Sequence, residues 1–443
     1  MTYDLVIGAR RAIVDGAERS CDLGIRDGQI AAIVEYGTLD LAIELGTDVV
    51  LLPGLVDTHV HVNEPGRTEW EGFATATRAA AAGGVTTIVD MPLNSIPPTV
   101  DVAALEAKQA AARDQAYVDV GFWGGAVPGN VASLKPLHDA GVFGFKCFLL
   151  HSGVDEFPPL DAAGVEAAMR ELATFDGLLI VHAEDASTID HAPVPDGRSY
   201  AAFLASRPPE AEDRAIARVI ELARTTGCRV HILHLSSASA LPMIAAARAN
   251  GVRITAETCP HYLTFAAEEI PDGATQYKCC PPIRTAANRE ALWQGLAEGT
   301  IDGIGSDHSP CPPAMKRLDT GDFGAAWGGI ASLQLGLPAI WTGARARGFA
   351  LADVVRWLAV RPAEVAGFRR KGRIALGYDA DLCAFGVEES LVVEAARLLH
   401  KHPITPYDGR RLAGRVQRTW LRGMEISESD ERPHGRFLAR GDA

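Results

Sequence analysis

LLPGLVDTHVH, residues 51–61, is an apolar run that ends in two histidines separated by one residue. Side chains alternate along a β-strand, so residues two apart point the same way. His59 and His61 can therefore present both imidazoles to one metal ion. An isolated pair of this kind is as often two ordinary histidines, but its place directly after an apolar strand favours metal ligands.

Seven further apolar runs follow along the chain, at residues 85–91, 118–126, 141–150, 178–184, 229–235, 252–258 and 301–307. Alanine-rich segments with helical periodicity lie between them, at 76–84, 102–116, 165–175, 217–227 and 240–251. Strands covered on both faces are apolar throughout, so eight of them alternating with helices predict an α/β fold, a (β/α)8 barrel. The alternative, an open doubly wound sheet, would begin with a glycine-rich phosphate turn, where this chain has His59-Val60-His61.

The two ends of the chain share a different pattern. Residues 1–50 alternate apolar and polar positions around the turns Asp15-Gly16 and Asp27-Gly28, and residues 372–384 and 414–426 repeat this style. We therefore predict a small β-sandwich domain made of residues 1–50 and 366–443, and a barrel domain of residues 51–365.

Composition excludes several classes of protein. Of the 443 residues, 47% are hydrophobic and 22% charged, which allows a large core. The net charge of -14 gives no attraction to nucleic acid or an anionic membrane, and no run of about 18 apolar residues predicts a membrane span. The first residues lack the basic-then-apolar order of a signal peptide. The eight cysteines form no CxxC pair. We therefore expect free thiols in a reducing cytoplasm.

Side chains with metal-binding chemistry follow several of the predicted strands, where barrel enzymes carry their active sites. Lys146, His182, His234 and Asp307 end the fourth, fifth, sixth and eighth runs. A lysine in an apolar strand is costly unless it is paired, reaches outward or is neutralised. Carboxylation by carbon dioxide would turn Lys146 into an anion able to bridge two cations.

The remaining candidates each have a structural alternative. Asp307 could bind a metal with one oxygen and accept a proton with the other, or it could cap a helix. His182 and His234 suit zinc as neutral imidazoles, although lone histidines at strand ends are more often structural. His231 lies three residues before His234, so we expect it to face away from the site, and we expect His308 to play a supporting part.

The motifs resemble the cyclic-amidohydrolase branch of the amidohydrolase superfamily, which includes dihydropyrimidinases, dihydroorotases and allantoinases. They are PGLVDTHVH, GGVTTIVDMP, GFKCF, VHAE, HLSS, ETCPHYL, PPIR, GSDHSP and GYDADLCAF, and they span nearly the whole chain. The resemblance implies two divalent metal ions, zinc or alternatively cobalt or manganese, with a hydroxide bridging them. It also implies that His59 and His61 bind one ion, that His182 and His234 bind the other, that N6-carboxylated Lys146 bridges them, and that Asp307 is a ligand and proton carrier. A homotetramer is common among such proteins.

Departures from related patterns indicate the substrate. Dihydroorotases usually carry HxHxREPG and an MPNT-like segment, whereas this chain has Asn63 and Leu93 in place of the arginine and asparagine that assist carboxylate binding. We therefore expect a substrate without a carboxylate. Arg67 could take over the role of the missing arginine, so dihydroorotase activity stays an alternative.

The stretches NEPGRTEWEGF, DMPLNS and KCCPPIR resemble the allantoinase group within this branch. The resemblance implies hydrolysis of allantoin to allantoate in purine catabolism, with substrate contacts at Cys280, Gly328 and Asn94 and with Trp327 as a wall of the pocket or a packing residue. The alternatives are a dihydropyrimidinase or hydantoinase, and a non-catalytic structural relative. Such relatives lack the ligands that this sequence retains.

Overall fold

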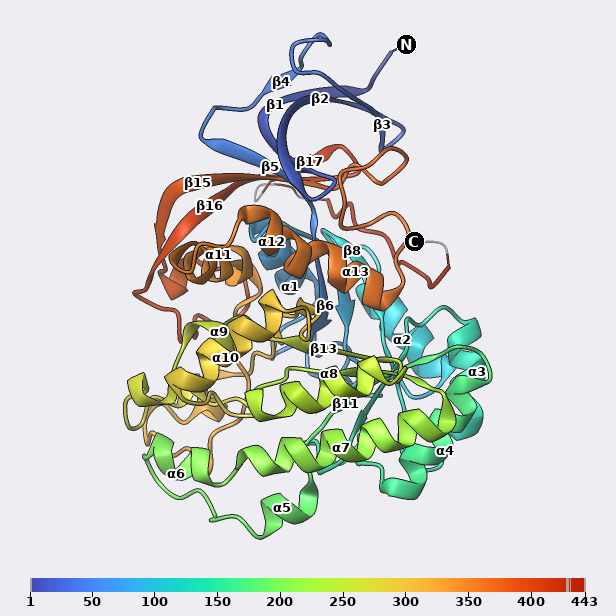
Figure 1. Cartoon of the computed structure of the whole chain (residues 1–443), viewed down its shortest axis with the longest axis vertical. Helices are drawn as coiled ribbons and strands as arrows, with labels where there is room; N and C mark the ends of the chain where they lie inside the picture. Colours follow the sequence, from blue (N-terminus) through green and yellow to red (C-terminus); the bar gives the residue numbers. More distant parts are fainter. Residues whose placement is uncertain (1, 428–429, 431, 442–443) are drawn as a thin grey trace.

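The computed structural model describes residues 2–427, 430 and 432–441. Strands from both chain ends form one sheet in the order β17-β16-β15-β5-β1-β2-β3, with β4 paired to β1 (Figure 1). Their bounds are β1 Leu5–Val14, β2 Ala17–Arg26, β3 Gln29–Val34, β4 Ile43–Glu44, β5 Val49–Pro53, β15 Leu382–Val392, β16 Arg411–Leu421 and β17 Met424–Ile426. Antiparallel pairing of β5 with β15 joins the two ends. The boundaries at residues 50 and 366 stay predictions.

The central part of the chain consists of parallel strands separated by helices. The strands are β6 Leu55–Val60, β7 Val85–Asp90, β8 Asp119–Phe122, β9 Gly124–Gly125, β10 Phe145–Phe148, β11 Leu178–His182, β12 Arg229–Ile232, β13 Ile254–Thr258 and β14 Gly303–Ile304. They form a sheet β6-β7-β8 and a sheet β14-β13-β12-β11-β10-β9. Each predicted apolar run therefore contains strand, and the third contains both β8 and β9.

The two parallel sheets meet at both of their ends. Between β8 and β9, the backbone N–H of Trp123 donates to Asp90 of β7, and that of Gly124 donates to Gly144, which precedes β10. At the other end, a parallel bridge joins Val60 of β6 to His308, which follows β14. This arrangement brings the carboxyl ends of β6 and β14 together, although they lie far apart in the sequence.

Helices surround these strands, and α7 runs across the face seen in Figure 1. The helices are α1 Phe73–Ala82, α2 Val102–Ala112, α3 Val131–Asp139, α4 Ala162–Ala173, α5 Ala186–Asp190, α6 Tyr200–Ala205, α7 Pro209–Thr226, α8 Leu241–Ala249, α9 Pro260–Thr264, α10 Ala286–Ala297, α11 Gly336–Ala346, α12 Leu351–Val355 and α13 Arg361–Ala366. Side chains of Asp101, Asp161 and Thr285 accept hydrogen bonds at the starts of α2, α4 and α10 and so fix where these helices begin.

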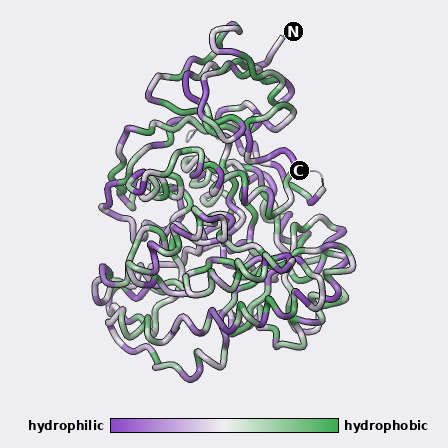
Figure 2. Tube along the Cα trace, viewed as in Figure 1, coloured by the Kyte–Doolittle hydropathy of each residue, from purple (hydrophilic) through white to green (hydrophobic). Residues whose placement is uncertain are grey.

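The main core lies between the parallel strands and the helices. Every residue of β6, β7 and β11 is buried, which explains why these runs are apolar without alternation. Short apolar stretches alternate with polar ones along the whole trace (Figure 2). Within the described residues, no helix is both long and apolar enough to cross a membrane.

Candidate metal centre

The six predicted metal ligands come together at the carboxyl ends of the parallel strands. Five of them, His61, Lys146, His182, His234 and Asp307, line one cavity of about 660 Å³. His59 is fully buried behind it, with its Nε2 3.2 Å from Oδ1 of Asp307. Nε2 of His61 lies 3.5 Å from the same oxygen, so both rings of the HxH pair reach one point, as their spacing predicts.

Histidine rings link the two halves of the site. The ring of His234 lies 5.3 Å from that of His59 and 4.5 Å from that of His182, measured between centroids. Nδ1 of His234 is buried and has no hydrogen-bond partner in the described part of the chain. Unpaired buried acceptors are costly. Nitrogen donors beside a carboxylate are what zinc-type cations bind, so the residues fit a metal site.

Buried carboxylates orient two of these rings from behind. Glu257 of β13 contacts Nδ1 of His59, and Oε2 of Glu184 lies 2.7 Å from Nε2 of His182. A carboxylate on one ring nitrogen fixes the tautomer and directs the other nitrogen toward a metal. The sequence interpretation gave neither acid a role, although ETCPHYL and VHAE contain them. His231 is buried and lies 3.3 Å from Glu257 through Nε2, outside the cavity lining.

The substitution Glu257→Gln tests this orienting contact. An amide binds the imidazole N–H more weakly than a carboxylate, so we expect metal affinity to fall about 10- to 100-fold. Competition with a chromophoric chelator measures that affinity, and Glu298→Gln on the exposed end of α10 is the matched control. Unchanged metal affinity in Glu257→Gln would contradict the assignment.

Polar networks fix the strand ends that carry the ligands. The carboxylate of Asp57 accepts hydrogen bonds from the backbone N–H groups of His59 (3.0 Å) and Ser306 (3.1 Å), which ties β6 to the end of β14. Glu212 of α7 accepts from the backbone N–H groups of Ser236 and Ser237 at 3.0 and 3.1 Å, and Arg284 pairs with it at 2.7 Å. The motifs HLSS and PPIR therefore meet next to His234.

The backbone is strained at two of the predicted ligands. His234 and Asp307 have φ angles of 36° and 44°, a region that residues other than glycine rarely adopt. Such conformations persist only where the surrounding structure enforces them, and they concentrate at functional sites.

The electrostatics of the centre favour bound cations. Burial by itself lowers the pKa of His59, but the carboxylates of Asp307 and Glu257 outweigh it and raise this pKa to about 9. Burial lowers the pKa of Lys146 to about 8, although the same two carboxylates oppose the shift. Burial would also raise the pKa of Asp307, yet His59 and the neighbouring histidines hold it well below its usual range. Asp307 is therefore ionised at neutral pH.

These pKa values predict how metal uptake depends on pH. A ligand imidazole must be neutral, and His59 with a pKa of about 9 loses its proton as the pH rises. Lys146 must also be neutral to react with carbon dioxide, and its pKa is about 8. Metal-free protein should therefore bind zinc more tightly at about pH 9 than at about pH 7, with proton release, at constant dissolved carbon dioxide. Titration with a pH indicator measures both effects, and affinity that falls over this range would contradict them.

The predicted substrate contacts surround the same cavity. Asn94, Cys280 and Gly328 all line it, as do Leu93 and Trp327. A Cβ atom at Gly328 would lie 3.6 Å from Sγ of Cys280, so the two loops are neighbours. Trp327 packs edge-on against Trp70 at 5.0 Å between ring centroids. Trp327 therefore packs against Trp70 and also forms part of the cavity wall.

Two buried lysines hold the loop that carries Trp327 and Gly328. Nζ of Lys278 donates to the carbonyl oxygens of Gly324 (3.2 Å) and Ala326 (2.6 Å). Nζ of Lys316 donates to the carbonyl of Trp327 (3.1 Å) and contacts that of Gly329. These bonds fix residues 324–329 against the cavity.

Asn63 and Arg67, which bear on whether the substrate carries a carboxylate, are not part of the cavity wall. Asn63 donates to the carbonyl of Pro310 at 3.4 Å and is absent from the cavity wall. Arg67 pairs with Glu156 and donates to the carbonyl of Asn94 at 3.0 Å. Its guanidinium is therefore engaged by these two partners, and Arg67 is absent from the cavity wall. His308 faces Glu71 at 3.4 Å and is absent from the cavity wall.

Known proteins share both the sequence and the fold. Residues 50–425 match the model of the amidohydrolase family. An allantoinase of Streptomyces avermitilis is 55% identical, with 99% of each chain covered. An allantoinase of Saccharomyces cerevisiae is 49% identical over 96% of this chain and 94% of the other. The solved L-hydantoinase (dihydropyrimidinase) of Arthrobacter aurescens superposes with a TM-score of 0.92 at 29% identity, covering 99% of this chain and all of that one.

The chain belongs to the amidohydrolase family. Within that family it is a hydrolase that acts on cyclic amides, as its full-length relatives show.

Proposed function

We propose that the protein is an allantoinase, which opens the hydantoin ring of allantoin to give allantoate. The observation that carries the proposal is a cluster of candidate metal ligands in a cavity whose wall offers no unpaired arginine for a substrate carboxylate among its described residues. In the described chain, Arg67 is turned away and Leu93 stands where a carboxylate-binding asparagine would lie. Full-length similarity to allantoinases supports the same substrate.

The metal centre is proposed to hold two divalent cations, zinc in the first place. His59 and His61 would hold one, His182 and His234 the other, with carboxylated Lys146 between them and Asp307 on the first. When bound, such a pair of cations supplies hydroxide at neutral pH and polarises the amide carbonyl. This chemistry needs neutral imidazole donors and an ionised Asp307, so His59 would lose its proton when the metal binds.

The protein side chains perform the remaining steps. Asp307 is ionised, so its free carboxylate oxygen accepts the proton of the attacking water and delivers it to the departing ring nitrogen. Cys280 and Gly328 are proposed to bind the ring through their backbones, and Asn94 through its amide. The loop held by Lys278 and Lys316 positions Gly328 without any rearrangement.

A direct test incubates metal-loaded protein with allantoin and follows allantoate. We expect turnover that disappears after chelation and returns when zinc is added. A purified protein that holds no stoichiometric metal after metal-replete growth would instead favour a non-catalytic relative.

We also infer that the two parallel sheets close into a (β/α)8 barrel, supported by the contacts at Trp123 and His308. A homotetramer in the cytoplasm remains the expected assembly and location. Light scattering of the purified protein measures the assembly, and a monomer would refute it.

A further inference from the structure

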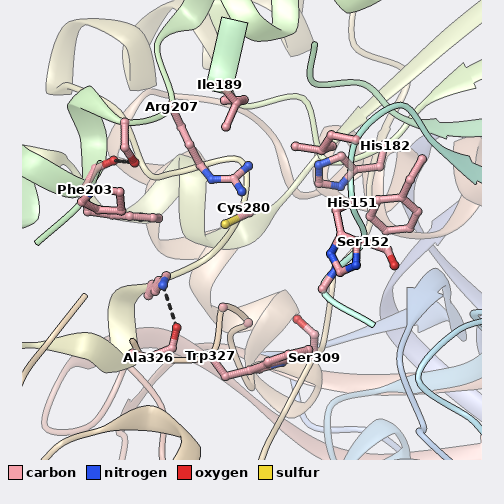
Figure 3. A pocket seen from close by; sticks show the side chains of 18 of the residues that line it. His151, Ser152, His182, Ile189, Phe203, Arg207, Cys280, Ser309, Ala326 and Trp327 are labelled. Atoms are coloured by element: carbon pink, nitrogen blue, oxygen red, sulfur yellow. Dashed lines mark hydrogen bonds between the residues drawn. The ribbon is translucent and has the colours of Figure 1, made fainter. Parts of the chain in front are cut away.

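Arg207 places a cationic hydrogen-bond donor in the wall of the cavity, away from the predicted metal ligands. It lies in the turn between α6 and α7, and its side chain is 20% exposed. In Figure 3 its guanidinium points into the cavity above Cys280 and between Ile189 and Phe203. The carbonyl of Arg207 accepts a hydrogen bond from Arg284 at 3.1 Å, which fixes this turn.

The orientation of the guanidinium is set from one side. Its Nη1 contacts Oε2 of Glu184, the same oxygen that lies 2.7 Å from Nε2 of His182. Glu184 is fully buried, so it fixes both partners. Within the described chain, the Arg207 side chain makes no other hydrogen bond. A guanidinium carries five N–H donors in a planar fork, so donors remain for a ligand.

Two other basic side chains of the cavity wall already have hydrogen-bond partners. Lys278 donates to the carbonyl oxygens of Gly324 and Ala326. His151 lies 3.2 Å from Asp155 through Nε2, and its Nδ1 accepts from the backbone of Gly153. Arg207 is therefore the side chain of the described wall best placed to donate to a polar group beyond the metal centre.

The charge balance indicates which group fits. Glu184 already compensates the positive charge of Arg207, so an added carboxylate would leave an excess negative charge in a buried setting. A neutral carbonyl oxygen with high acceptor strength needs no further compensation. A urea carbonyl is such a group, and it is planar like the guanidinium.

We propose that Arg207 is a specificity-determining residue that binds the carbonyl oxygen of the ureido arm on C5 of allantoin. This inference rests on the proposed function and extends it from the ring to its substituent. The ring would lie at Cys280 and Gly328, and the arm would extend along the wall toward Arg207. The apolar neighbours Ile189 and Phe203 would exclude water from that contact.

The unaltered, metal-loaded enzyme gives the first test. 5-Isobutylhydantoin has an arm of nearly the same length as that of allantoin, but a CH2 group replaces the inner N–H, and two methyl groups replace the carbonyl oxygen and the terminal NH2. We expect its kcat/KM to be at least about 100-fold lower than that of allantoin, because a site built to hydrogen-bond an arm rejects one that cannot. If the analogue is not turned over, its inhibition constant against allantoin replaces kcat/KM. Equal values for the two compounds would overturn the proposal.

The variant Arg207→Lys gives the second test. Lysine keeps a positive charge beside Glu184 but loses the planar fork. We expect kcat/KM for allantoin to fall about 10- to 100-fold, mainly through KM, while the value for 5-isobutylhydantoin stays within about twofold. Arg218→Lys is the matched control, since Arg218 pairs with Asp185 outside the cavity and is 49% exposed.

The losses of kcat/KM for the two compounds are compared, and metal content is measured on each variant. Equal losses for both compounds, with or without loss of metal, would mean that Arg207 acts only through Glu184 and His182, and would overturn the inference. Unchanged allantoin turnover in Arg207→Lys would overturn it as well. Unaltered enzyme that hydrolyses hydantoins but not allantoin would refute the proposed function itself.

Discussion

Lys146→Ala should purify with little bound metal and lose at least about a thousandfold in kcat. Lys146 is 1% exposed on β10 and lines the cavity. The carboxylates of Asp307 and Glu257 raise its pKa only in part, and burial outweighs them. Such a lysine would be a poor structural choice, since burial penalises its charged form. Carboxylation would remove that penalty and supply the bridging anion.

Short carboxylic acids provide the decisive control for this variant. The methyl side chain leaves space where the lysine was, so acetate or propionate with added zinc should restore part of the activity. Elemental analysis and kcat are measured together, and Lys135→Ala on exposed α3 should change neither. A Lys146→Ala protein with two metal ions and near-normal kcat would contradict the bridging role.

Asp307→Asn should lower kcat by about a thousandfold or more while the protein stays folded. The amide has nearly the same shape but cannot accept the proton that the carboxylate moves to the leaving nitrogen. Histidines keep Asp307 ionised despite its burial, which is the state that this role requires.

Asp302→Asn is a suitable comparison for that variant. Asp302 lies just before β14 and pairs with Arg248 at 2.7 Å and with Arg361, outside the cavity. The substitution Asp302→Asn should lower Tm and leave kcat nearly unchanged, because it alters a similarly buried acid that does not line the cavity. If Asp307→Asn behaved like Asp302→Asn, the proton-carrying role would be wrong.

The strands and the ligand positions could be predicted because both depend on local pattern. Strands buried on both faces must be apolar, and residues two apart on a strand must share a face. Each predicted apolar run contains strand, and His59 and His61 both reach Asp307. The predicted helical segments overlap α1, α2, α4, α7 and α8, although α7 begins eight residues earlier than predicted. The helices α3, α5, α6 and α9 to α13 were not predicted, and several of them are only five or six residues long.

What could not be predicted depends on contacts between distant segments. Glu257 meets His59 across 198 positions of sequence, and β5 pairs with β15 across the whole central domain. No periodicity encodes such partners. The principle that a ligand histidine needs an acidic partner could have drawn attention to Glu184, two residues after His182. The engagement of Arg67 by Glu156 likewise required the folded chain, and it settles where that guanidinium points.

A parallel assay of metal-loaded protein with allantoin, hydantoin, dihydrouracil and dihydroorotate tests the central claim most directly. The cavity wall carries five of the predicted metal ligands, the proposed ring contacts and Arg207, whose positive charge is already paired with Glu184. We expect kcat/KM for allantoin to exceed each of the other values by at least about 100-fold. Turnover of dihydroorotate far above that of allantoin would contradict the account.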